Sequence, residues 1–316
     1  MDRLLTRHGE ALPVYNRYDI AYDLGHAQQA LDVAFKGMEP QDDEPLYDRF
    51  RQHAPLHAHY AQVEAVAERS ADYAGNHLHF EARLVINPRL HVLLGATQQA
   101  QTGSGVVLGD LTPDFDQLAS LEARWLGPRA QYSLAVFARD SSQSLYGLRL
   151  GHTYQWTGHS SLEANLSLRA ESTLSLPLRV AGYENTIGGA ANFTLGKREY
   201  IRIAPRYSQY YTQWGDPLGT GQFLDVEAGY RFRIDYPDWR VSTYARWQDF
   251  SRETGLSSTA MLHLPPTLRN TIDAYGVDAV GLFVPESSLT WGTCLSMGEN
   301  LGGQNMQLIY TKAWRY

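Results

Sequence analysis

Two pairs of histidines have the residue type and spacing of possible metal ligands. His57 with His59, and His77 with His79, each place two imidazoles on one face of an extended segment, because side chains alternate along a strand. A bound zinc ion needs three or four converging ligands. In a hairpin built from these two segments the pairs lie at opposite ends. We therefore expect no shared metal site.

Three other motifs match catalytic or nucleotide-binding chemistry only in part. His159 and Ser161 could form a base and a nucleophile, but they fall in a short turn, point inward and lack a third orienting group. The segment from Gly103 to Gly109 is rich in glycine, but its spacing is wrong for a nucleotide loop and no helix is expected after it. Cys294 is the only cysteine, which excludes a disulfide framework and a cysteine-based zinc site. The sequence predicts no enzyme, no metal and no cofactor.

The elements that would position any site show strict alternation, which is clearest between Gln222 and Asp249. In the first of two runs there, one face carries Leu224, Val226, Ala228, Tyr230, Phe232 and Ile234, and the other carries Asp225, Glu227, Gly229, Arg231, Arg233 and Asp235. A period of two indicates β-strand. Each run is longer than the usual five or six residues and matches the ~9–11 that cross a membrane obliquely. This predicts a transmembrane hairpin whose charged face lines a wet interior.

The same pattern recurs from about residue 56 onward, in about 14 expected strands. They span approximately 57–68, 76–86, 89–99, 115–125, 130–139, 145–156, 159–170, 184–195, 200–212, 221–235, 239–250, 272–284, 288–297 and 305–316. Short turns alternate with longer connections, and short periplasmic turns are typical of outer-membrane barrels. An even count places both ends of the barrel on the periplasmic side.

These patterns predict an all-β fold for residues 55–316, an antiparallel transmembrane β-barrel of about 14–16 strands. The last strand supports this, because Met306, Leu308, Tyr310, Trp314 and the terminal Tyr316 share one face. A soluble β-sandwich is the structural alternative. It would need two packed apolar faces, whereas one face of these strands is repeatedly charged.

Composition agrees with a barrel in the outer membrane. Of 316 residues, 20 are Tyr, 7 are Trp and 27 are Gly, and the net charge of -7 argues against a nucleic-acid partner. No apolar run reaches the ~18 residues of a transmembrane helix. The start of the chain lacks the apolar segment of a signal peptide, so we expect it to be a fragment of a longer precursor.

Residues 1–54 show a helical pattern instead. Two helices are expected over 12–24 and 26–35, with small residues where they approach, and a third from Pro45 to about His53. This short α-helical segment resembles one tetratricopeptide (TPR) unit with a capping helix, and we expect it in the periplasm. A single unit cannot bury its own face, so an array should precede it. An ordinary helical plug or appendage is the alternative.

Parity along the strands predicts which side chains line the lumen. The acids are Glu64, Glu81, Glu122, Glu163, Asp225, Glu227, Asp235 and Asp278; the bases are Arg83, Arg124, Arg149, Arg169, Arg202, Arg206, Arg231, Arg233 and Arg246; Tyr244 joins them. The two signs nearly balance, so most pairs are expected to stiffen the wall.

The connecting loops are expected to hold a gate. A barrel of about 14 strands encloses an open channel, which would leak unless a loop covers it. The loops 100–114 and 251–271 are the candidates, and Asp110, Asp114 and Asp216 are expected to form an acidic mouth. Such a mouth would favour a cationic or neutral solute.

A helical repeat running directly into a barrel resembles the outer-membrane exporters of biofilm exopolysaccharides, in particular the PelB family. The residues that carry the resemblance are the repeat at 18–35, the helix Pro45–Phe50, and the terminal sequence 313–316. The resemblance covers essentially the whole chain, as the carboxy-terminal porin part of a longer protein. It implies about 16 strands and passive export of a partly deacetylated, cationic amino-sugar polymer.

The resemblance also implies partners besides membrane lipid and the polysaccharide chain. These are a ring of a small periplasmic lipoprotein, PelC-like, beneath the barrel, and a periplasmic modification enzyme that would bind the absent TPR array. Three alternatives stay open: an exporter of poly-N-acetylglucosamine, a general diffusion porin, and a barrel enzyme.

Overall fold

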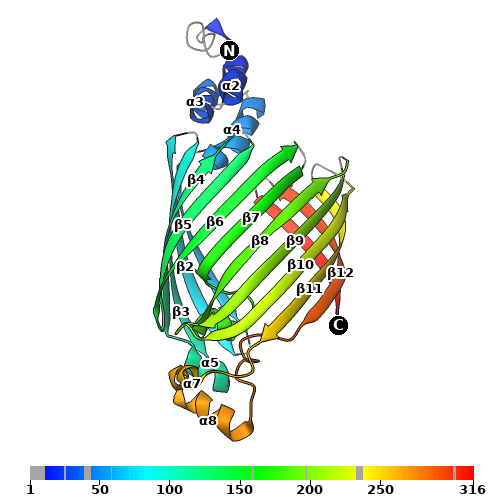
Figure 1. Cartoon of the computed structure of the whole chain (residues 1–316). Coiled ribbons are helices and arrows are strands. Elements are labelled where there is room, and N and C mark those ends of the chain that lie inside the picture. The colour runs from blue at the N-terminus through cyan, green and yellow to red at the C-terminus, as the bar shows by residue number, and fades with distance from the viewer. Residues whose placement is uncertain are drawn as a thin grey trace.

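The computed structural model describes residues 11–24, 26–38, 44–57, 59–70, 72–87, 89–127, 129–157, 160–196, 198–232, 238–301 and 304–316. Within these residues, thirteen strands form one sheet in which each strand pairs with the next in the chain (Figure 1). The strands are β1 (Tyr60–Arg69), β2 (Tyr73–Asn87), β3 (Leu90–Gly103), β4 (Phe115–Leu126), β5 (Ala130–Asp140), β6 (Ser144–Thr157), β7 (Ser160–Ala170), β8 (Gly182–Thr194), β9 (Glu199–Thr212), β10 (Pro217–Arg231), β11 (Asp238–Arg252), β12 (Ser288–Leu301) and β13 (Gln304–Arg315). All the pairings are antiparallel, as the alternation predicts.

The two faces of the sheet differ in character. Along β5, Leu134 and Val136 are 47% and 49% exposed, whereas Ala135 and Phe137 are 8% and 6% exposed. Figure 1 shows the sheet curved around an interior, so that one face is the inner one. Large apolar side chains stand exposed on the outer face from one end of the sheet to the other, among them Leu78, Leu121, Ile187, Leu224 and Trp291. An apolar outer face is what the hydrocarbon of a membrane accepts, and the expected class of transmembrane β-barrel is confirmed.

A charge placed on the outer face of β5 is expected to destabilise the protein in a bilayer. Leu134→Arg should cost about 2–4 kcal/mol, because it moves a cation into hydrocarbon near the middle of the strand. Ser133→Arg is the matched control, since the neighbouring position points inward, and it should cost much less. Folding into phospholipid vesicles across a urea series, followed by the gel mobility of unheated samples, measures both. Equal losses would contradict this orientation.

One expected strand is wrong. Residues 272–284 were predicted to form a strand, but α8 (Pro266–Tyr275) occupies the first part and turns occupy the rest. The apolar residues Val280, Phe283 and Val284, which favoured a strand, are all fully buried, and Phe283 and Val284 belong to a hydrophobic cluster. A short apolar run fits a strand and a buried packing segment equally well, so periodicity alone could not separate them.

An odd number of strands places the C-terminal end of the sheet on the side opposite its N-terminal end. With thirteen strands among the described residues, β1 and β13 run in the same direction. The backbone of Tyr316 pairs with Leu289 at the start of β12, which follows the loop-end helices. The expectation that both ends of the barrel share one side is therefore wrong for this structure.

Four short helices gather at the loop end of the sheet, and we call them the cap. They are α5 (Gly105–Leu111), α6 (Leu176–Ala181), α7 (Ser258–His263) and α8. Figure 1 shows α5, α7 and α8 beyond the strand ends, opposite the N-terminal helices. The expected loops at 100–114 and 251–271 are thus partly helical, and the connection between β7 and β8 holds α6. In α5, burial of Leu108 and Leu111 outweighs the low helix propensity of its glycines.

The N-terminal segment forms the helices that its pattern predicts. They are α2 (Val14–Asp23), α3 (Ala27–Gly37) and α4 (Glu44–His57). Their shared core comprises Tyr18, Ala21, Ala30, Ala34 and Leu46. The small residues let α2 and α3 pack closely, but membership of a repeat array stays a prediction. Within the part of the chain that the structure describes, no helix combines the length and apolarity needed to span a membrane.

His53 of α4 packs against one side of this core. Its ring lies 4.2 Å from that of Tyr22 and 6.3 Å from that of Tyr18, measured between centroids. Burial lowers the pKa of His53, and the nearby charge of Arg49 lowers it further. The imidazole is therefore neutral at neutral pH, which suits a site packed between two phenol rings.

Candidate functional site

The register places most of the predicted lumen residues on the inner face. They are Glu64, Glu81, Arg83, Glu122, Arg124, Arg149, Glu163, Arg202, Arg206, Asp225, Glu227, Arg231, Tyr244 and Arg246. Arg169 lies at the end of β7 with a φ of 55°, where the pairing with β8 is interrupted. Arg233 and Asp235 lie outside the described residues. Contact of any of these side chains with a solute stays a prediction.

Asp278 is misplaced in the sequence prediction. It follows α8 and is on no strand, and its carboxylate lies 3.3 Å from the Arg252 guanidinium at the end of β11. The error follows from the strand wrongly predicted at 272–284. The rule that alternate residues face the lumen applies only within a strand.

Five acids of the inner face have partners within the wall. Arginine holds two of them, with 2.7 Å between Arg124 and Glu122 and 2.8 Å between Arg246 and Asp225. Neutral donors hold three more: Asn192 donates to Glu163 at 2.8 Å, Tyr200 to Glu227 at 2.8 Å, and Tyr60 to Glu81. These contacts run between neighbouring strands or along one strand, which is the arrangement expected of pairs that stiffen the wall.

Several arginines of the inner face lie over aromatic rings. The guanidinium carbon is 4.5 Å from the Tyr60 centroid for Arg83, 5.0 Å from Phe137 for Arg149, and 4.0 Å from Phe223 for Arg206. A stacked guanidinium keeps its edge N–H donors available. These cation–aromatic contacts add to the ion pairs of the wall, and the balanced count of acids and bases did not reveal them.

The acidic mouth expected from Asp110, Asp114 and Asp216 stays a prediction. Asp110 lies in α5, and its side chain is outside the described part of the structure. Asp114 is exposed between α5 and β4. Asp216 accepts a hydrogen bond from Thr212 at 3.2 Å and lies 3.5 Å from the His263 ring nitrogen of α7. Asp216 thus joins the cap to the β9–β10 connection.

A hydrophobic cluster joins the cap to the inner wall. From the cap it includes Leu108, Leu111, Leu178, Leu268 and Ile272. From the wall it includes Tyr73, Tyr210, Leu218 and Phe223, and Tyr210 is completely buried. Helix α5 contacts both α6 and α8, so segments distant in sequence form one body at this end. Burying large apolar groups at about 25 cal/mol per Å² makes this body stable against the wall.

A buried arginine ties α6 to the wall. Arg139 of β5 is 4% exposed and donates from Nε to both oxygens of Asp116 on β4 at 3.0 Å. Its Nη2 also donates to the backbone oxygen of Arg179 at 2.7 Å, and its Nη1 to that of Gly182 at 3.4 Å. One guanidinium thus bridges two strands and the end of the helix.

Further polar contacts hold the same helix. Arg179 lies 3.1 Å from Glu68 of β1, and its guanidinium carbon is 4.8 Å from the Tyr73 centroid. Gln213 donates to the backbone oxygen of Val180 at 2.6 Å. Sequence reasoning missed all of these residues. Alternation along the strands predicts that Arg139 and Asp116 point inward. The sequence around them does not predict that α6 folds back to contact them.

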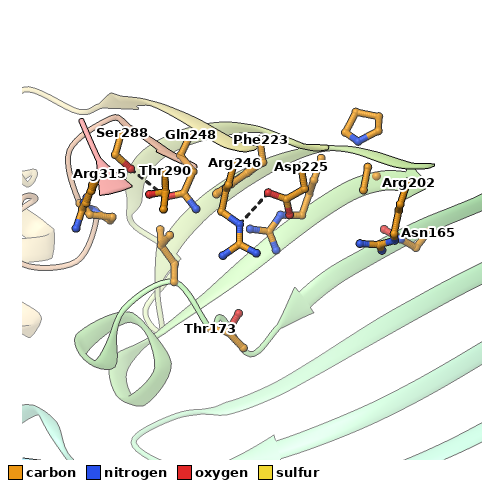
Figure 2. A pocket seen from close by; sticks show the side chains of 17 residues that line it. Asn165, Thr173, Arg202, Phe223, Asp225, Arg246, Gln248, Ser288, Thr290 and Arg315 are labelled. Carbon is orange, nitrogen blue, oxygen red and sulfur yellow. Dashed lines mark hydrogen bonds and ion pairs between the residues drawn. The ribbon is translucent and has the colours of Figure 1, made fainter. Parts of the chain in front are cut away.

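A polar cavity of 640 Å³ lies between the cap-proximal loops and the inner wall (Figure 2). Its wall residues come from β7 to β13, and Thr173, Leu174 and Pro285 line it from the connections around the cap. Figure 2 shows Arg202, Arg246 and Arg315 around one space, with Arg246 bonded to Asp225. The arrangement can bind a solute but offers no nucleophile with an oriented base.

The three described histidines of the paired motifs each have a different partner. His79 lies 2.8 Å from the Thr97 hydroxyl, His77 lies 3.7 Å from Glu68, and His59 accepts from the backbone N–H of Val85 at 3.1 Å. His159 lies outside the described residues. In the portion that the structure describes, no group of three histidine, cysteine or carboxylate side chains could hold a metal ion.

An apolar outer face, a polar inner face and a helical cap at the loop end define an outer-membrane β-barrel of the porin and transporter class. The sequence profile of the PelB C-terminal β-barrel domain matches residues 57–316. The chain belongs to this family. No curated protein matches the chain in sequence.

Two solved structures are similar to the chain at low sequence identity. A structure described as a bacterial polysaccharide outer membrane secretin matches 76% of this chain and 72% of its own, with 7% identity and a TM-score of 0.54. Wzi, an outer-membrane protein involved in group 1 capsule assembly in Escherichia coli, matches 92% of this chain and 88% of its own, with 9% identity and a TM-score of 0.36. The first of these likenesses supports the barrel fold.

Proposed function

We propose that this chain is a capped outer-membrane exporter of an exopolysaccharide. The observation that carries the proposal is the cap, which packs on the inner wall of a barrel of the PelB family. In this proposal the polymer moves passively through the lumen, and the cap shuts the pore when no polymer occupies it.

The width of the barrel explains why a cap is needed. Eight strands fill their interior with side chains, whereas thirteen described strands curve around a much wider space. An uncovered channel of that size would leak small solutes. The burial of Phe283, Tyr210 and Leu218 supports a cap that rests closed, because opening it would expose apolar surface to water.

The orientation and the partners are part of the same proposal. The helical segment 1–54 lies in the periplasm, and the barrel domain 55–316 is in the membrane with the cap outside. The short turns beside α4 support this, since short turns are periplasmic in outer-membrane barrels. A PelC-like lipoprotein ring beneath the barrel and a periplasmic modification enzyme are the partners that family membership suggests.

Family membership also supports a partly deacetylated, cationic amino-sugar polymer as cargo. The paired acids of the wall would not trap such a polymer, because conduction needs binding sites weak enough to leave. A poly-N-acetylglucosamine exporter and a general diffusion porin remain the competing functions. A diffusion porin would conduct steadily with the cap in place.

Removing one exposed contact of the cap should shift the closed-to-open equilibrium by a small amount. Glu68→Gln removes the ion pair with Arg179, in which Glu68 is 41% exposed. A pair this exposed is worth about 0.4–1 kcal/mol, so the open fraction should rise by about two- to fivefold. Single-channel recording in planar bilayers measures that fraction. Glu64→Gln, on the same face of β1, is the control. A closed fraction unaffected by either change would argue against gating at this contact.

A further inference from the structure

The cavity between the cap-proximal loops and the wall carries an excess of positive charge. Arg202, Arg206, Arg246 and Arg315 line it, and among the described residues Asp225 is the only carboxylate of the lining. Asp225 is already bound by Nε of Arg246 at 2.8 Å. The cavity therefore presents more cationic groups than its own acid can neutralise.

The arginines are presented with their donors available. Arg206 lies over the Phe223 ring at 4.0 Å, which fixes the guanidinium plane and leaves its edge N–H groups unused by that contact. For Arg202 and Arg315, no hydrogen bond or ion pair is recorded with any residue that the structure describes. Arg246 contacts Asp225 through Nε, which leaves both of its terminal nitrogens for another acceptor. Forked guanidinium donors of this kind match the two oxygens of a carboxylate.

Neutral hydrogen-bonding groups complete the lining. Asn165, Thr173, Gln248, Ser288 and Thr290 surround the arginines (Figure 2). Gln248 accepts from the Ser288 hydroxyl at 3.4 Å, so its amide N–H₂ group is turned toward other partners. Side chains that both donate and accept suit the hydroxyl groups of a sugar.

The size of the cavity also fits a sugar better than a bare ion. Its 640 Å³ lies within the ~300–1,000 Å³ range of small-molecule sites. The four arginines come from three strands, β9, β11 and β13, and Figure 2 shows Arg202 and Arg315 at opposite ends of the space. A single small anion could reach only some of them.

From this geometry we infer a binding site for a sugar that carries a carboxylate, such as a uronate residue of an oligosaccharide. Arg202, Arg206 and Arg246 bind carboxylate groups along such an oligosaccharide, and the neutral side chains bind the hydroxyl groups. The site lies on the inner wall beside the cap connections, so an occupant would sit in the path of anything leaving the lumen. The inference goes beyond export and does not depend on the charge of the exported polymer.

The test is calorimetric titration of the detergent-solubilised full chain. Trigalacturonate is the probe, with maltotriose as the neutral control, a glucosamine trimer as the cationic control, and inorganic phosphate as the bare anion. Trigalacturonate should bind, and its affinity should fall as NaCl is raised, because the contacts are charged. Maltotriose, the glucosamine trimer and phosphate should each bind at least about tenfold more weakly.

Variants locate the site. The double change Arg202→Gln with Arg206→Gln should weaken trigalacturonate binding at least about tenfold, since each removes a charge-assisted contact. Arg149→Gln is the matched control, because Arg149 is an inner-face arginine outside the cavity, and it should leave the affinity unchanged. Gel mobility of unheated samples confirms that each variant is folded.

Three results would overturn the inference. They are equal binding of the glucosamine trimer, equal binding of phosphate, or an equal loss of affinity in Arg149→Gln. Channel recordings of the same samples test the proposed export function separately. A capped pore can lack the sugar site and still open when the cap is loosened.

Discussion

Asp116→Ala is expected to destabilise the protein by about 3–5 kcal/mol and to release α6 from the wall. The change leaves the Arg139 guanidinium, 4% exposed, without its carboxylate in a place that water does not reach. Because the same guanidinium also donates to the backbone of α6, its displacement removes the attachment of that helix. Urea unfolding in detergent micelles measures the free energy, and channel recording measures the open fraction.

Two comparisons make this result specific. Asp225→Ala breaks an ion pair whose side chains are 39% and 55% exposed, so it should cost no more than about 1 kcal/mol. A double change, Asp116→Leu with Arg139→Met, removes both buried charges and should recover much of the stability. It should not restore the closed pore, because methionine cannot bond the α6 carbonyls. A double variant that is stable and fully closed would show that Arg139 does not hold the cap.

Phe283→Asp is expected to open the pore by breaking the cap cluster. Phe283 is fully buried, and its backbone oxygen accepts from Ser175 at 2.6 Å beside α6. Losing a buried phenylalanine costs about 3–5 kcal/mol, which shifts a closed-to-open equilibrium by about a hundredfold or more. The rate at which proteoliposomes swell in graded maltooligosaccharides measures the opening.

The control for this change lies on the same segment. Tyr275, at the end of α8, is 81% exposed, so Tyr275→Asp adds the same charge without entering the cluster. Its proteoliposomes should swell as slowly as those of the unaltered chain. Equal swelling in all three would mean that the cluster does not control access to the lumen.

The barrel wall could be predicted from the sequence because apolar and polar residues alternate along each strand. Each apolar residue that faces lipid is followed by one that faces the interior, so the runs around Leu134 and Leu224 identified strands and faces together. The helices α2 to α4 were likewise marked by small and apolar residues at helical spacing. These patterns lie within single strands and helices, so they can be read without knowing which strand or helix is the neighbour.

The cap could not be predicted, because tertiary packing decides its structure. The segment 105–111 is rich in glycine and valine, and only burial against the wall makes it a helix. Helix α6 is a single short turn-like element between two strands, and its contacts with Arg139 lie 40 or more residues away in sequence. The basic cavity was hidden for the same reason, since counting charges cannot show which acids are already paired.

The most direct test of the account is a single-channel recording of the chain with residues 255–284 replaced by a short Gly-Ser linker. Gln248 pairs with Ser288 across β11 and β12, so a short linker can join the strands without strain. The account predicts that the unaltered chain is closed or opens briefly, while the replaced chain shows a large, steady conductance. An unaltered chain that is already steadily open, with a conductance equal to that of the replaced chain, would contradict a capped exporter and favour a general diffusion porin.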